Sequence, residues 1–198
     1  MAGSSTDSPR FFYDLASPDA YVAAERVVGV LGVVPEFVPV RLAGLAAGGV
    51  GTFRCAEEEA SFKEDVERRA AAAGLLPVRW PERFPAETEW AMLVATYAKQ
   101  AGRVVAFSMA AFRQAFAAGR DLGERDTVLI AAAAAEMHPA AVVKGAELRG
   151  TRARLDAATA EAAETGVLDV PAVAIGGRVF HGEAELAAAA AAAGAAAR

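Results

Sequence analysis

The chain has 198 residues, of which 55% are hydrophobic and 23% are charged, and its formal net charge is −5 at pH 7. This composition is typical of a folded globular protein, and the length suits one sizeable domain or one domain with an insertion. Because the chain is acidic and contains no stretch dominated by Lys and Arg, we expect no nucleic-acid partner. No window holds the roughly 18 uninterrupted apolar residues of a membrane helix, so no membrane association is predicted. The small, polar first ten residues lack a signal-peptide pattern, and we expect a cytoplasmic protein.

Cys55 is the only cysteine in the chain. An intrachain disulfide and dithiol redox chemistry within the chain are therefore excluded. The chain has just two histidines, His138 and His181, besides that cysteine, so we expect no His/Cys metal site.

The first predicted elements are a short strand over Phe11–Leu15 and a helix that runs to Leu31. Ser17 stands where an N-cap belongs, and Pro18 stands at the first helical position. The N-terminus of a helix carries free N–H groups and about half a positive charge, so it favours an anion. Two interpretations of Ser17 stay open from this stretch alone: it only caps its helix, or its hydroxyl also contacts a bound anion.

A second strand is predicted over Glu36–Val40, which completes a βαβ unit with parallel strands. A Gly-rich connection follows, and then a region of about 100 residues without a convincing strand. Leu75–Pro85, with three prolines, is expected to be extended. Charged residues between Lys63 and Arg69 are typical of a solvated helix face. The helices predicted here cover 57–73, the region of 90–97, the region of 105–116, 127–137 with Asp126 as its cap, 139–145 and 147–165.

Strands return over Val170–Ile175 and Arg178–His181, joined by a Gly176–Gly177 pair that fits a two-residue hairpin turn, and a helix over 183–196 closes the chain. The order of elements predicts an α/β fold: a thioredoxin-like domain (βαβ…ββα) with a large all-helical insertion. We expect residues 10–42 and 151–198 to form the thioredoxin-like domain and residues 43–150 to form the helical insertion domain.

Three segments of the chain resemble one known family. They are the stretch 12–21 (Phe-Tyr-Asp-Leu-Ala-Ser-Pro-Asp-Ala-Tyr), the stretch 166–171 (Gly-Val-Leu-Asp-Val-Pro) and the stretch 180–183 (Phe-His-Gly-Glu). Together with the element order, they resemble the 2-hydroxychromene-2-carboxylate isomerases and kappa-class glutathione transferases. These enzymes form a DsbA-like branch of the thioredoxin superfamily in which serine replaces the first redox cysteine.

The resemblance implies that Ser17 is catalytic and stabilises the thiolate of glutathione or another low-molecular-weight thiol. A redox version of the site would need cysteines at Ser17 and Ala20, and neither is present. In the resembled isomerases the thiol is thought to add to a conjugated carbonyl substrate, which then rotates and releases it. The resemblance also implies a cis Val170–Pro171 bond, with the Val170 backbone facing the cofactor, and commonly a homodimer. The cofactor-binding residues expected from it are Pro18, Val170, Pro171, Gly182, Glu183 and Ala184.

Substrate contacts are expected from Trp80 and Phe84, which could line an aromatic pocket between the two parts of the fold, and from His181 at the end of the hairpin. Packing in the core is the alternative role for the two aromatic side chains. The predicted partner is thus a small carbonyl compound that is conjugated or aromatic.

Several polar positions depart from the family. Ala47 stands where lysine is common, Glu87 replaces an asparagine, and Ala184 replaces an acidic or similar polar residue. Each lost charged hydrogen bond costs about 1.5–3 kcal/mol, so a different thiol or an inactive site stays open. Three functions are therefore weighed: a thiol-dependent cis/trans isomerase, a kappa-like glutathione transferase that forms thioether conjugates, and a non-catalytic binding protein on a thioredoxin-like scaffold.

Overall fold

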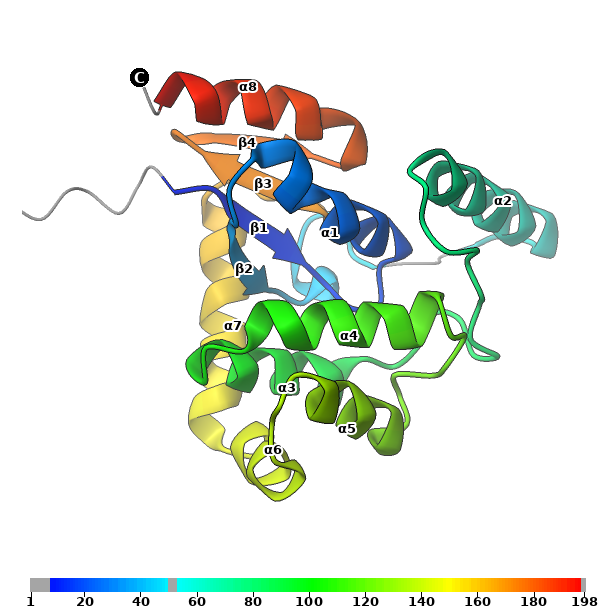
Figure 1. The fold of residues 1–198 in the computed structure, drawn as a ribbon, viewed down its shortest axis with the longest axis vertical. Coiled ribbons are helices and arrows are strands. Elements are labelled where there is room, and N and C mark those ends of the chain that lie inside the picture. Colours follow the sequence, from blue (N-terminus) through cyan, green and yellow to red (C-terminus); the bar gives the residue numbers. More distant parts are fainter. Residues whose placement is uncertain (1–7, 50–52, 197–198) are drawn as a thin grey trace, which may run out of the picture.

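The computed structural model describes residues 8–49 and 53–196, and its centre is a four-stranded sheet with the strand order β2-β1-β3-β4 (Figure 1). β1 (Arg10–Tyr13) pairs in parallel with β2 (Glu36–Pro39), and α1 (Pro18–Leu31) connects them. β3 (Ala172–Ile175) runs antiparallel to β1 and also to β4 (Arg178–His181). The βαβ unit, the closing hairpin and the α/β fold class are thereby confirmed.

Helices make up most of the remaining described chain. In order they are η1 (Leu42–Gly44), α2 (Ala56–Ala72), α3 (Glu89–Gln100), α4 (Val104–Phe116), α5 (Arg125–Ala134), α6 (Pro139–Ala146), α7 (Arg149–Glu164), η2 (Glu183–Glu185) and α8 (Leu186–Ala196). No strand occurs between β2 and β3 in the described residues, as the sequence predicts. No single helix within 8–49 and 53–196 is long and apolar enough to cross a membrane. Of the helices in these ranges, only α5 and α6 taken together have the length and composition of a membrane span, and they meet at a bend of 120°.

The two faces of the sheet are buried against different helices because successive strand residues point to opposite sides. Phe11 and Tyr13 belong to the larger apolar cluster, which extends into α1, α8 and the helices α3 to α6. Phe12 and Val38 face the other way, into a smaller cluster that includes side chains of α7. The larger cluster therefore links the sheet to most of the helical region. The division into a thioredoxin-like domain and a helical insertion domain, with boundaries at 42/43 and 150/151, stays a prediction.

Several predicted element ends are wrong. The strand predicted from Val170 starts only at Ala172, and the helix predicted to reach Met137 ends at Ala134. The predicted β1 continued to Leu15, but the strand ends at Tyr13 and the chain turns toward α1. The predicted cap Asp126 lies inside the first turn of α5, which has Glu124 as its N-cap residue. The predicted helix over 183–196 starts as the 3-10 turn η2, so α8 begins only at Leu186.

The hairpin turn between β3 and β4 has the conformation that its two glycines allow. Gly176 has φ 56° and Gly177 has φ 74°, so both residues lie in the left-handed region. A two-residue turn with positive φ at both positions matches the twist of antiparallel strands and favours glycine.

Candidate functional site

The N-terminus of α1 is built by Ser17 and Pro18. Ser17 has an extended backbone, with φ −88° and ψ 115°, and its Oγ accepts a hydrogen bond from the Ala20 N–H at 3.1 Å. Pro18 is buried at the first helical position, where its missing N–H costs no helical hydrogen bond. Ser17 itself is only 2% exposed. The structure therefore assigns a cap role to its side-chain oxygen, which leaves the hydroxyl hydrogen as the group that could donate to an anion.

Asp14 fixes the loop that leads into Ser17. Its carboxylate, in a residue only 6% exposed, accepts the backbone N–H groups of Ala16 at 2.9 Å and Leu42 at 2.9 Å. The Thr88 hydroxyl donates a third hydrogen bond at 3.2 Å. Burial raises the pKa of Asp14 above its ordinary value, although these three hydrogen bonds act in the opposite direction. One buried carboxylate thus joins the end of β1 to η1, which follows β2, and to the start of α3.

The loop before β3 contains the cis peptide bond Val170–Pro171. The Val170 N–H donates to the Asp169 carboxylate at 2.7 Å. His181 accepts the Leu168 N–H at its Nε2 at 3.0 Å, so its ring supports the same loop. The Val170 N–H, which the resemblance assigns to cofactor binding, is therefore already bound by Asp169 in this structure. The sequence does not indicate this contact.

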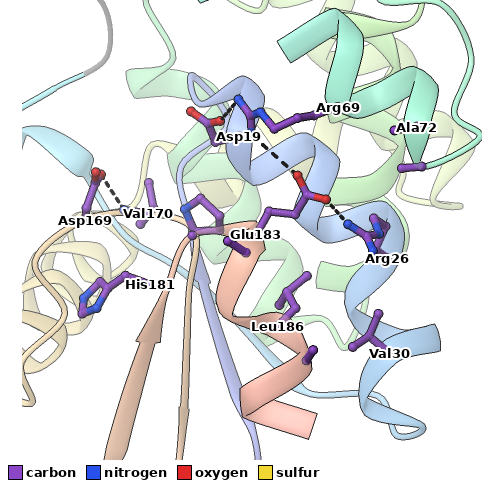
Figure 2. Close-up of a pocket in the computed structure, with 15 residues that line it drawn as sticks. Asp19, Arg26, Val30, Arg69, Ala72, Asp169, Val170, His181, Glu183 and Leu186 are labelled. Atoms are coloured by element: carbon purple, nitrogen blue, oxygen red, sulfur yellow. Dashed lines mark hydrogen bonds and ion pairs between the residues drawn. The ribbon is translucent and has the colours of Figure 1, made fainter. Parts of the chain in front are cut away.

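A cavity of about 760 Å³ lies between this loop, α1, the end of α2 and the start of α8 (Figure 2). It contains most of the predicted cofactor residues and one predicted substrate residue. Those lining it are Val170, Pro171, His181, Gly182, Glu183 and Ala184. The volume lies within the range of about 300–1,000 Å³ that is common for small-molecule sites.

Four of the predicted site residues are not in the lining of this cavity: Ser17, Pro18, Trp80 and Phe84. The cavity does reach the first turn of α1, because Asp19 lines it together with Pro171. The N-terminus of α1 is therefore next to the cavity, while the side chain of Ser17 is covered.

Trp80 and Phe84 contact each other in an aromatic cluster outside the cavity lining. Their ring centroids are 4.8 Å apart, and Phe62 of α2 stacks on Phe84 at 6.3 Å. Lys63 lies over both rings, with its Nζ 5.4 Å from the Trp80 centroid and 5.3 Å from that of Phe84. The structure thus brings the two predicted aromatic residues together, but as packing partners of α2. A role in substrate binding stays a prediction.

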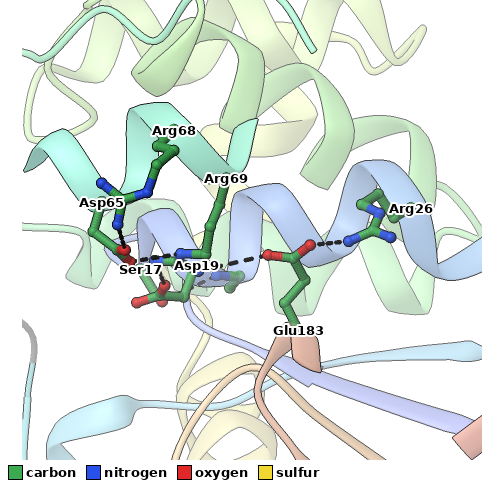
Figure 3. Close-up of polar contacts among 8 residues, drawn as sticks. Ser17, Asp19, Arg26, Asp65, Arg68, Arg69 and Glu183 are labelled. Atoms are coloured by element: carbon green, nitrogen blue, oxygen red, sulfur yellow. Dashed lines mark hydrogen bonds and ion pairs between the residues drawn. The ribbon is translucent and has the colours of Figure 1, made fainter. Parts of the chain in front are cut away.

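Charged side chains from three elements meet on the cavity wall (Figure 3). Glu183 of η2 forms ion pairs with Arg26 of α1 and with Arg69 of α2, the latter at 3.6 Å. Arg69 also binds Asp19 at 2.6 Å and Asp65 at 2.7 Å. Burial alone would lower the pKa of Arg69, but its acidic partners raise it overall.

Arg69 corrects one interpretation of the sequence. The run from Lys63 to Arg69 looked like a solvated helix face, yet Arg69 reaches across to α1 and η2. No local pattern indicates this contact, because its partners are 50 and more residues away in the chain. The sequence does not indicate the contact of Arg26 either, since an arginine on an amphipathic helix is expected to be solvated.

Fold and site together define a thioredoxin-like α/β protein with a serine, not a cysteine, at the start of its first helix. The chain belongs to the DsbA-like thioredoxin domain family, whose model matches residues 10–193. A search of curated proteins finds no match.

Several solved structures share this fold, and two of them illustrate the range of their named activities. A 2-hydroxychromene-2-carboxylate isomerase matches with a TM-score of 0.83 and 20% identity, over 96% of each chain. A probable DsbA oxidoreductase from Streptomyces coelicolor matches with a TM-score of 0.80 and 22% identity, over 95% of this chain and 90% of the other. The resemblance inferred from the sequence is confirmed at the level of the family and the fold.

Proposed function

We propose that this protein is an enzyme that uses glutathione or a similar small thiol to isomerise conjugated or aromatic carbonyl compounds. The observation that carries the proposal is the juxtaposition of the α1 N-terminus, capped by Ser17, with a cavity lined by Val170 and Pro171. The single cysteine, Cys55, is exposed at the start of α2, so a dithiol mechanism within the chain has no second thiol.

A bound thiol would supply the nucleophile, and the residues of this chain would hold its sulfur as an anion. The Ser17 hydroxyl would donate a hydrogen bond to it, and the helix N-terminus would add favourable potential. Thiols near helix N-termini ionise more readily, which is the effect that this site needs. The cavity also carries both signs of charge, in Arg26, Arg69, Asp169 and Glu183, which suits a ligand such as glutathione with carboxylates and an ammonium group.

The test is a titration with glutathione near neutral pH, followed by thiolate absorbance. Wild type and Ser17→Thr, which keeps a hydroxyl, should give a saturable increase, while Ser17→Ala should give none. Calorimetry with S-methylglutathione, which cannot ionise, controls for binding and should give similar affinities for all three proteins. If wild type and Ser17→Ala leave the added thiol equally protonated, the proposal is wrong.

Product analysis then separates the two enzymatic functions. An isomerase returns the thiol unchanged and rearranges the carbonyl compound, whereas a kappa-like transferase consumes the thiol and releases a thioether. A 2-hydroxychromene-2-carboxylate is the first substrate to assay, because the similar solved structure is an isomerase of that compound.

Two observations favour the third candidate, a non-catalytic binding protein. Ser17 is 2% exposed, and the Val170 N–H is occupied by Asp169. A catalytic site requires that both become accessible when a ligand binds. If the protein only binds ligands, neither wild type nor Ser17→Ala should ionise the thiol, and Ser17→Ala should lose only stability.

A further inference from the structure

Glu183 is enclosed by two arginines that come from different helices. Its carboxylate contacts Arg26 of α1, and its Oε2 is 3.6 Å from the Nη1 of Arg69 of α2 (Figures 2 and 3). The side chain of Glu183 is only 10% exposed, whereas those of Arg26 and Arg69 are 38% and 31% exposed. A nearly covered carboxylate therefore sits between two cations that still reach the solvent side of the cavity.

The two arginines depend on Glu183 to different degrees. Arg69 is also held by Asp19 at 2.6 Å and Asp65 at 2.7 Å, so it keeps its position without Glu183. In the part of the chain that the structure describes, Glu183 is the only polar partner of the Arg26 side chain. Most of the N–H donors of Arg26 are therefore free to bind another oxygen anion.

We propose that Arg26 and Arg69 form a binding site for the carboxylate of a small organic acid, which displaces Glu183 from between them. Guanidinium groups bind carboxylates through paired N–H donors, so a ligand carboxylate can replace the one that Glu183 supplies. The two anions cannot share the site, because like charges a few ångströms apart repel strongly in a partly buried cavity.

The rest of the cavity suits the apolar part of such a ligand. Val30, Leu186 and Ala187 line it beside the arginines, so a hydrocarbon or aromatic body would lie against aliphatic side chains. This site deepens the proposed function, since it names a ligand class for the same cavity, but it uses neither Ser17 nor a thiol.

A purely structural role makes the opposite prediction. If Glu183 only fastens α2 to the body of the protein, its removal loosens that helix and creates no affinity for anions. The sign of the change in affinity for a carboxylate therefore distinguishes a binding site from a purely structural ion pair.

The experiment measures binding of 3-phenylpropanoate and of its uncharged analogue 3-phenylpropanamide by calorimetry. Glu183→Gln should bind the acid about tenfold more tightly than wild type, because the competing carboxylate is gone, and should bind the amide as wild type does. The double variant Glu183→Gln with Arg26→Gln should lose this gain. Ser17→Ala should bind the acid as wild type does, so failure here is distinguishable from failure of the thiol proposal.

Glu183→Asp provides the second variant. It keeps the charge but withdraws the carboxylate by one methylene, so it should give a smaller gain in the same direction, and it decides the outcome if Glu183→Gln does not fold. The proposal is overturned if neither variant gains affinity for the acid, if the amide gains equally, or if the double variant keeps the gain.

Discussion

Replacing Asp14 tests whether one buried carboxylate fixes the loop in front of Ser17. Asp14→Ala removes the acceptor of the Ala16 and Leu42 N–H groups, both bound at 2.9 Å, and of the Thr88 hydroxyl at 3.2 Å. Asp14→Asn is the matched control, since it keeps the shape and one oxygen. Its amide nitrogen cannot accept a hydrogen bond, so one backbone N–H loses its partner.

The expected loss follows from the donors that remain unpaired. A buried donor without a partner costs about 1–3 kcal/mol, and Leu42 is only 4% exposed, whereas the half-buried Ala16 can recover part of its loss from water. Removing a buried carboxylate offsets part of this cost. We expect Asp14→Ala to lower the free energy of unfolding by about 2–4 kcal/mol and Asp14→Asn by about half as much.

The pH dependence has a definite sign. Burial, the largest influence on Asp14, raises its pKa in the folded protein above the ordinary value of 3.8. A group with a raised folded pKa contributes stability that is fully present below its unfolded pKa and is lost as the pH rises through its folded pKa. The stability advantage of wild type over Asp14→Asn should therefore shrink as the pH rises above 3.8.

Urea unfolding of wild type and both variants at several pH values measures these differences. An advantage of wild type that grows with pH would refute the reasoning, because it would mean that the three donors outweigh burial and lower the pKa. Equal stability of Asp14→Ala and wild type would show that the loop does not depend on this carboxylate.

Three further substitutions test local features of the fold, and each is measured by urea unfolding. Gly145→Ala should lower stability by about 1–3 kcal/mol, because a Cβ there would lie 2.4 Å from the Tyr97 ring; full stability would mean that the ring can move away. Gly29→Ala, an exposed site in α1 with nothing within 4 Å, should raise stability by about 0.5–1 kcal/mol; a loss would contradict the open surroundings. Tyr13→Phe should cost about 1–2 kcal/mol, because it removes the 2.5 Å hydrogen bond to buried Ser108; no loss would show that this bond adds little.

Local chemistry makes the start of α1 and the hairpin turn predictable. Ser17 followed by Pro18 is a start signal that acts through the residues themselves, and the helix begins at Pro18. The pair Gly176–Gly177 is similarly sufficient for its turn, because only residues that tolerate positive φ fit both positions.

The charged parts of the site could not be predicted, because their partners are distant in the chain. Asp14 binds Leu42 and Thr88, which are 28 and 74 residues away. Among the described residues, the Ala16 N–H is the one hydrogen-bond partner of its carboxylate nearby in the chain. In the sequence, Asp14 is an acidic residue directly after a buried aromatic strand, where a charge without partners would be costly. Arg26 and Glu183 are 157 residues apart, and their contact exists only once α1 and η2 pack together.

The charges of the cavity constrain how an anion can bind there. Arg26 and Arg69 line it together with Asp19, Asp169 and Glu183, so carboxylates outnumber guanidinium groups in the lining. A negatively charged ligand therefore gains no attraction from net charge and depends on where individual groups lie. The α1 N-terminus offers oriented donors for a sulfur anion, and the displacement of Glu183 exposes two arginines to a carboxylate. Because the sulfur anion and the carboxylate of the acid would contact different groups, a protein that binds the acid but leaves the thiol protonated would be a binding protein for organic acids on a thioredoxin-like scaffold.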